Sequence, residues 1–153
     1  MALTLDIADA VVAELNAAPP GTFDPAFTAM RRVLPVFDLA EMADLHVSVV
    51  PRAIEIAGAT RSASQYDVQI DIGVQQKLTS GGGGGDLDQQ VPPLCELVDQ
   101  IATYLTRRVL QADPGVPNAV WVRLANDPIY APEHLSQLRQ FTSVLTLTYR
   151  ITR

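Results

Sequence analysis

The strongest constraint on the fold is the C-terminal segment 141–152, in which apolar and polar side chains alternate. A period of two residues places each set on its own face of a β-strand. The apolar set is Phe141, Leu145, Leu147, Tyr149 and Ile151, and the polar set is rich in threonine, whose branched Cβ suits a strand. We expect a long strand with one buried face, which needs neighbours to pair its backbone groups.

Residues 66–75 show the same alternation and are the best expected partner of this strand. Their apolar positions are Tyr66, Val68, Ile70, Ile72 and Val74. A sheet buried on both faces would read as continuous apolar runs. The two segments therefore predict an antiparallel or mixed sheet that is covered on one face only, and the open face must contact solvent, DNA or another subunit.

The remaining segments complete an expected α+β fold: four to five strands, two main helices packed on one face, and a long β-hairpin. Amphipathic helices are expected over residues 5–16 and 94–110, the second with Pro92 and Pro93 at its start. A strand over residues 45–56 would form the hairpin with residues 66–75, with Arg61 in its extended tip.

Three shorter segments carry further expectations. Residues 119–124 predict a strand that places Trp121 and Arg123 on one face. Residues 23–34 fit either a helix or an edge strand, of which we favour the strand. Residues 37–42 predict a short helical turn with Asp38 as its N-cap.

The length of 153 residues predicts a single domain, residues 1–153, that needs no disulfide or metal. Residues 79–86 contain five consecutive glycines and predict a flexible loop. A phosphate-binding loop would need a following Lys-Ser/Thr pair or a Gly-x-Gly-x-x-Gly turn, and the segment has neither.

The composition argues against several classes of function. A net charge of −6 and a pI near 4.7 disfavour a surface that grasps nucleic acid. Cys95 is the one cysteine, and His46 and His134 lack metal-ligand spacing, so we expect no disulfide, metal or cofactor. No Gly-x-Ser-x-Gly motif occurs, and residues 1–15 lack the pattern of a signal peptide or membrane span. We expect a soluble cytoplasmic protein that is not an enzyme.

The order of these elements, with the strand patterns of residues 45–52, 66–75 and 141–150, resembles small neck proteins of tailed bacteriophages and prophages of the tail terminator (tail completion) type. The resemblance covers nearly the whole chain and rests on strand patterns, with no catalytic signature. It implies a ring, typically a homohexamer, that caps the tail tube and presents a surface to head-completion proteins. The pentaglycine tract departs from this pattern.

This resemblance implies a location in the neck or tail of the virion, after assembly in the cytoplasm of the host bacterium. Expected partners are further copies of the chain, the tail-tube protein and a head-completion or stopper protein, with no membrane. An acidic channel would let DNA pass without specific binding. The candidate subunit or partner contacts are Arg52, Arg61, Trp121, Ile129, Tyr130 and Leu135.

Other functions stay open at this point. A head-completion stopper or adaptor and a tail-tube subunit belong to the same structural class. From a different class, the chain could be a small cytosolic ligand-binding or enzymatic α+β domain that uses Asp67, Asp71 and His46.

Overall fold

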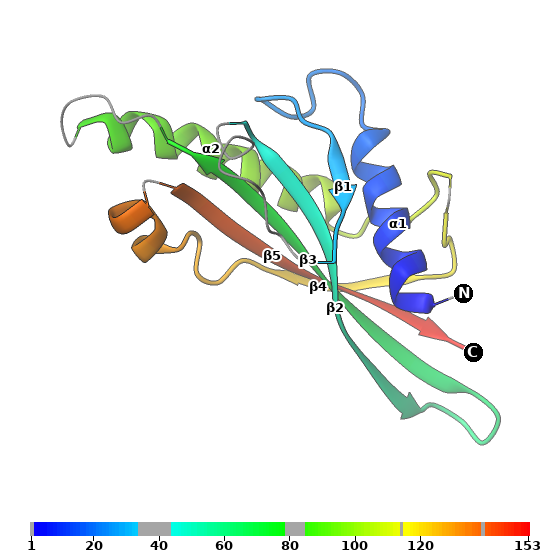
Figure 1. Cartoon of the computed structure of the whole chain (residues 1–153). Helices are drawn as coiled ribbons and strands as arrows, with labels where there is room; N and C mark the ends of the chain where they lie inside the picture. Colours follow the sequence, from blue (N-terminus) through cyan, green and yellow to red (C-terminus); the bar gives the residue numbers. More distant parts are fainter. Residues whose placement is uncertain (1, 34–43, 79–84, 114, 139) are drawn as a thin grey trace.

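The computed structural model describes residues 2–33, 44–78, 85–113, 115–138 and 140–153. Its elements in chain order are α1 (Leu3–Asn16), β1 (Ala29–Arg31), β2 (His46–Gly58), β3 (Ser64–Lys77), α2 (Gly85–Leu105), β4 (Val120–Ala125), the π-helical turn η1 (His134–Leu138) and β5 (Gln140–Thr152). Figure 1 shows the arrangement. The expected α+β class is confirmed, with two main helices and a five-stranded mixed sheet.

The strands lie in the order β1-β2-β3-β5-β4. β1 is parallel to β2, and the other neighbours are antiparallel. β3 and β5 pair continuously from Gln65 opposite Thr152 to Lys77 opposite Gln140. The expected pairing of the two alternating segments is therefore confirmed, and their ladder forms the centre of the sheet.

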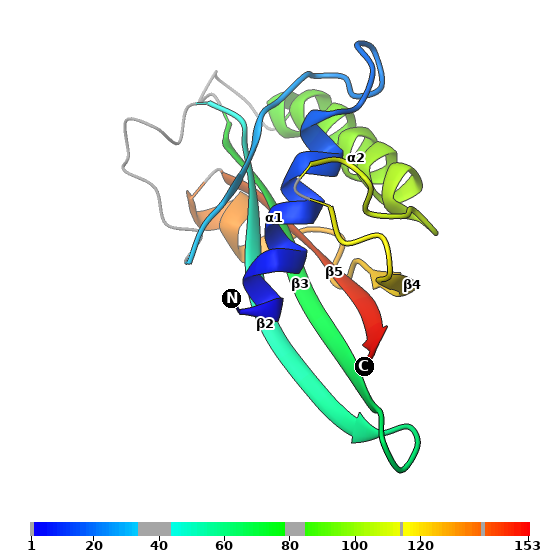
Figure 2. The ribbon, with the colours of Figure 1, turned by 90° about the vertical axis from the view of Figure 1, so that its right-hand side faces the viewer.

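Both helices pack on one face of this sheet, as Figures 1 and 2 show. α1 crosses β1, β2 and β3, and α2 contacts β5. The buried layer between helices and sheet includes Ile7, Leu97, Ile70, Ile72, Leu145 and Leu147. Each fully buried aliphatic side chain contributes about 1.5–3 kcal/mol relative to exposure, so this layer is the main source of stability. The opposite, open face carries the polar positions of the strands.

The β2–β3 hairpin extends beyond the helices as a projecting arm (Figures 1 and 2). We use "arm" for residues 53–66. A bulge between Pro51 and Ala53 begins it, and antiparallel pairing continues to Gly58 opposite Ser64. Residues 52–62 are all exposed. The expected hairpin is thus present, and about half of β2 lies outside the packed body.

The second helix differs from the expected range 94–110. It begins at Gly85 and ends at Leu105, so Pro92 and Pro93 lie inside it. Gly85 and Asp86, expected in a flexible loop, are helical, and residues 79–84 lie outside the described part of the chain. The helix ends early because Arg107 adopts the left-handed conformation with φ of 58°. Leu110, within the range expected to be helical, is instead buried in the loop that follows the helix, and Val109 is 43% exposed.

The expected edge strand over residues 23–34 is mostly wrong. Among residues 23–33, which the structure describes, only Ala29–Arg31 forms a strand, β1. Phe23 instead packs its ring on Phe27 and Tyr104, at centroid distances of 4.9 and 5.3 Å. Aromatic packing on α2 therefore outweighs strand pairing in this segment. The expected turn over residues 37–42 lies outside the described residues.

The strand expected over residues 119–124 is present as β4, but its faces were wrongly predicted. The register shifts by one residue between Trp121 and Arg123. Trp121 lies opposite the buried Tyr149, whereas Arg123 lies opposite Thr148 on the open face. A bulge adds one residue and so reverses the alternation beyond it.

The end of α2 gives a direct test. Arg107→Gly should raise the free energy of unfolding by about 0.5–1 kcal/mol, because glycine adopts a positive φ without a Cβ penalty. Thr106→Gly is the matched control and should lower stability, since Thr106 donates to the Ala102 carbonyl at 2.7 Å. Urea unfolding measures both variants. Equal destabilisation by the two substitutions would contradict this description of the helix end.

Candidate functional site

The arm carries an apolar strip that remains exposed. Ile54 and Ile56 are 38% and 61% exposed. They lie opposite Val68 and Tyr66, which places them on the face of the sheet that the helices cover elsewhere. Val68 is fully buried, so the core face runs past the helices and onto the arm. Exposed apolar side chains on a projecting element are typical of a protein contact.

The outer edge of β2 is also open along the arm. β1 pairs only with Val47, Ser48 and Val49, and the described part of the chain places no strand beside residues 50–58. An open edge offers unpaired N–H and C=O groups to another strand. The arm therefore presents an apolar strip and a pairing edge together.

A second apolar surface lies at the opposite edge of the sheet. This β4 groove has a volume of about 450 Å³ and is lined by Arg107, Arg108, Val109, Pro117, Ala119, Val120, Trp121 and Val122. Val109 and Val120 are 43% and 62% exposed. The indole Nε1 of Trp121 is buried and has no acceptor among the described residues. A buried donor without a partner is unfavourable, so an incoming acceptor would stabilise this groove.

The six contacts expected from the sequence are divided among different parts of the molecule. Arg61 lies exposed in the arm tip and Trp121 lines the β4 groove. Ile129 is 59% exposed, whereas Tyr130 and Leu135 pack against the core. Tyr130 contacts the ring of Phe141 at a centroid distance of 6.2 Å, so it covers the end of the sheet.

The sixth expected contact, Arg52, lies on the open face at the start of the arm. Its Nη1 is 3.4 Å from the Asp71 carboxylate and donates to Thr146 Oγ1 at 3.2 Å. Arg52 thus contacts its own sheet, while its side chain remains 53% exposed. Ile54, Ile56 and Val109 are exposed apolar residues that were not among the six expected contacts, because their exposure depends on how far the helices extend.

The two carboxylates considered for catalysis are both in ion pairs. Asp67 accepts from Arg150 Nε and Nη2 at 2.8 and 3.1 Å, and Asp71 is paired with Arg52. The hydrogen bond from Arg150 holds the pKa of Asp67 below its ordinary value. Four residues along a strand separate the carboxylates by about 13 Å, more than acid–base pairs allow. This arrangement favours ion pairing over catalysis.

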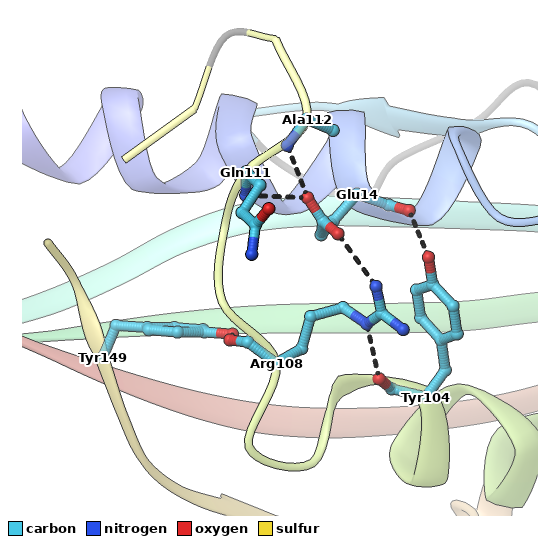
Figure 3. A network of polar contacts seen from close by, with 6 residues as sticks. All are labelled: Glu14, Tyr104, Arg108, Gln111, Ala112 and Tyr149. Carbon is cyan, nitrogen blue, oxygen red and sulfur yellow. Dashed lines mark hydrogen bonds and ion pairs between the residues drawn. The ribbon is translucent and has the colours of Figure 1, made fainter. Parts of the chain in front are cut away.

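A network of polar contacts around Glu14 includes Arg108, which also lines the β4 groove (Figure 3). The Glu14 side chain is 7% exposed and accepts from Arg108 Nη1 at 3.0 Å. It also accepts from the backbone N–H groups of Gln111 and Ala112 at 3.0 and 2.7 Å. The carboxylate of α1 thus holds the loop that follows α2.

The same network reaches α2 and the central sheet. Tyr104 Oη donates to the Glu14 carbonyl at 3.1 Å, and Arg108 Nε donates to the Tyr104 carbonyl at 2.9 Å. Tyr149 Oη donates to the Arg108 carbonyl at 2.6 Å, and burial raises the pKa of that phenol, which keeps it protonated. Glu14 therefore has a structural role: it positions Arg108 and the groove.

Two further observations limit the chemistry of the described residues. They contain no cluster of three or more His, Cys, Asp or Glu side chains that could hold a metal ion. None of their helices is long and apolar enough to cross a membrane. Cys95 is half-buried, and burial raises the pKa of its thiol, which disfavours the reactive thiolate.

No protein-family model and no curated protein matches this sequence.

Removing the Glu14 carboxylate tests the network. Glu14→Ala should lower the free energy of unfolding by about 3–5 kcal/mol, because Arg108 and two backbone donors lose a buried acceptor. Asp9→Ala is the control: Asp9 pairs with Arg31 at 2.6 Å in a partly exposed site, and its loss should cost at most about 1 kcal/mol. Denaturant unfolding compares the two, and similar small losses would contradict the structural role of Glu14.

The Asp67–Arg150 pair predicts a dependence on pH. A carboxyl group with a lowered folded-state pKa stabilises the fold above its unfolded pKa, and that stability is lost as pH falls through the folded-state pKa. Wild type should therefore exceed Asp67→Asn in stability at about pH 7 and match it near about pH 2. Unfolding curves at both pH values measure the gap, which should not persist in acid.

Proposed function

We propose that this chain is a structural protein of the tailed-phage neck that forms a ring, caps the tail tube and joins it to head-completion proteins, leaving a channel for DNA. The observation that carries the proposal is that one chain has two different exposed apolar surfaces, the arm and the β4 groove. A subunit with one protruding and one receiving surface is suited to head-to-tail assembly.

The two surfaces are complementary in chemistry. Ile54 and Ile56 supply apolar side chains, and Val109 and Val120 supply exposed apolar counterparts in the groove. The free edge of β2 also provides carbonyl acceptors, which the buried Trp121 Nε1 needs. We propose that the arm of one copy lies in the β4 groove of the next.

A contact between two different surfaces is heterologous, and it closes into a ring when the rotation between copies closes. The resemblance to tail terminators favours a closed ring of about six copies. The net charge of −6 supports passage of DNA through the channel without binding. The tail-tube and head-completion proteins would contact the two rims of the ring.

The related phage proteins differ from a tail terminator in how they assemble. A tail-tube subunit would stack into filaments, because its rings bind one another repeatedly. A stopper or adaptor would bind the head-completion side without capping tube ends. A ligand-binding role is the second candidate, and it is favoured by one observation, a pocket of about 370 Å³ on the open face.

Variants of the two surfaces test the head-to-tail contact. Ile56→Asp damages the arm but leaves a groove, and Val120→Asp damages the groove but leaves an arm. Each variant alone should associate at least about tenfold more weakly than wild type, because a carboxylate would be buried in an apolar contact. An equimolar mixture retains one intact contact per pair, so native mass spectrometry should detect heterodimers that grow no further.

The control is Val33→Asp, which alters a valine that is 79% exposed and lies outside both surfaces, and it should assemble as wild type does. If both arm and groove variants assemble like wild type, the arm–groove contact is wrong. If the mixture shows no heterodimer although wild type forms rings, the ring uses other surfaces. Wild-type filaments in place of rings would favour a tail-tube subunit.

A further inference from the structure

The open face of the sheet contains a pocket that the proposed ring contact does not use. Its volume is about 370 Å³, and it is lined by Val50, Asp71, Gly73, Gln75, His134, Thr142 and Val144. These residues belong to β2, β3, β5 and the π-helical turn η1. The pocket therefore lies on the face opposite the helices, apart from the β4 groove.

The polar groups of this pocket include acceptors that lack donors. Gln75 is only 8% exposed, and its Oε1 is buried without a hydrogen-bond partner among the described residues. The hydrogen bonds that Asp71 accepts from Arg52 and Thr146, at 3.4 and 3.0 Å, both involve Oδ1. A carboxylate has two oxygens with lone pairs, so Oδ2 retains capacity to accept. A ligand that donates hydrogen bonds would satisfy both groups.

The other polar lining groups are already engaged with each other. His134 Nδ1 lies 2.9 Å from Thr142 Oγ1, which also accepts from Gln140 Nε2 at 3.0 Å. His134 and Thr142 therefore line one side of the pocket and already have hydrogen-bond partners. The acceptors with remaining capacity are Asp71 and Gln75 on β3.

The rest of the pocket is apolar and contains open space. Val50 is half-buried, and Val144 is 38% exposed. At Gly73 an added Cβ would meet no atom within 4 Å. The pocket can therefore accommodate a short apolar stem beside its acceptors.

We infer that this pocket binds an organic cation: a guanidinium or primary ammonium group on a short apolar stem. Arg52 reaches Asp71 only through Nη1, which is 3.4 Å from Oδ1, so Oδ2 can accept charge-assisted hydrogen bonds from a second cation. The buried Gln75 oxygen accepts one donor, and the valines contact the stem. The same chemistry is offered by a free amine or guanidine and by an arginine side chain of another subunit.

Nuclear magnetic resonance titration of the purified chain tests this inference. The probe is butylguanidinium, and the matched control is butylurea, a neutral molecule of nearly the same shape. Butylguanidinium should produce saturable shifts of the Val50 and Val144 methyl signals. Butylurea should bind at least about tenfold more weakly, because its hydrogen bonds to the carboxylate are not charge-assisted.

Two variants locate the binding. Gly73→Val fills the pocket in open space and should abolish the shifts. Gly58→Val is its control, because Gly58 lies in the same hairpin, also has open space around an added Cβ, and is remote from the pocket. Gln75→Leu removes the orphan acceptor and should weaken binding at least about tenfold.

The oligomeric state during the titration identifies the source of the cation. An unchanged mass indicates that the pocket takes a free cation. Dissociation of an assembly in proportion to probe binding indicates an arginine side chain of a neighbouring copy. No saturable shift, equal binding of butylurea, or unchanged binding to Gly73→Val would overturn the inference. If the chain is monomeric and still binds butylguanidinium, the proposed ring is contradicted and the pocket inference stands.

Discussion

The β3–β5 ladder is the constraint on which the rest of the structure depends. Thirteen residue pairs join the two strands without a register shift, whereas both flanking pairings contain a bulge. One face of this ladder supplies the core against α1 and α2, and the other face carries Asp67, Asp71 and Thr148. Because the helices cover only part of the length of β3, the hairpin that it forms with β2 continues beyond the core.

Two incomplete surfaces follow from this arrangement. At one edge, the arm extends the core face past its helical cover and leaves Ile54 and Ile56 exposed. At the other edge, β4 ends the sheet beside a loop that Glu14 holds in place through Arg108, Gln111 and Ala112. The proposed head-to-tail contact would join these two different surfaces on neighbouring copies.

Much of the fold could be predicted from the sequence, because a period of two specifies a half-buried strand directly. The pairing of residues 66–75 with 141–152 and the single covered face were both correctly predicted. The errors came from local events that periodicity does not report: the bulge after Trp121 and the left-handed Arg107 that ends α2. The site was harder to predict, since exposure of Ile54 and Ile56 depends on how far the helices reach across the sheet.

The most direct test of the proposed ring is the native mass of the purified wild-type chain across a concentration series, with negative-stain images of the heaviest species. A ring subunit should form one discrete closed ring of about six copies above a threshold concentration. A chain that stays monomeric throughout the series, and that also fails to bind the ends of tail tubes, would contradict it.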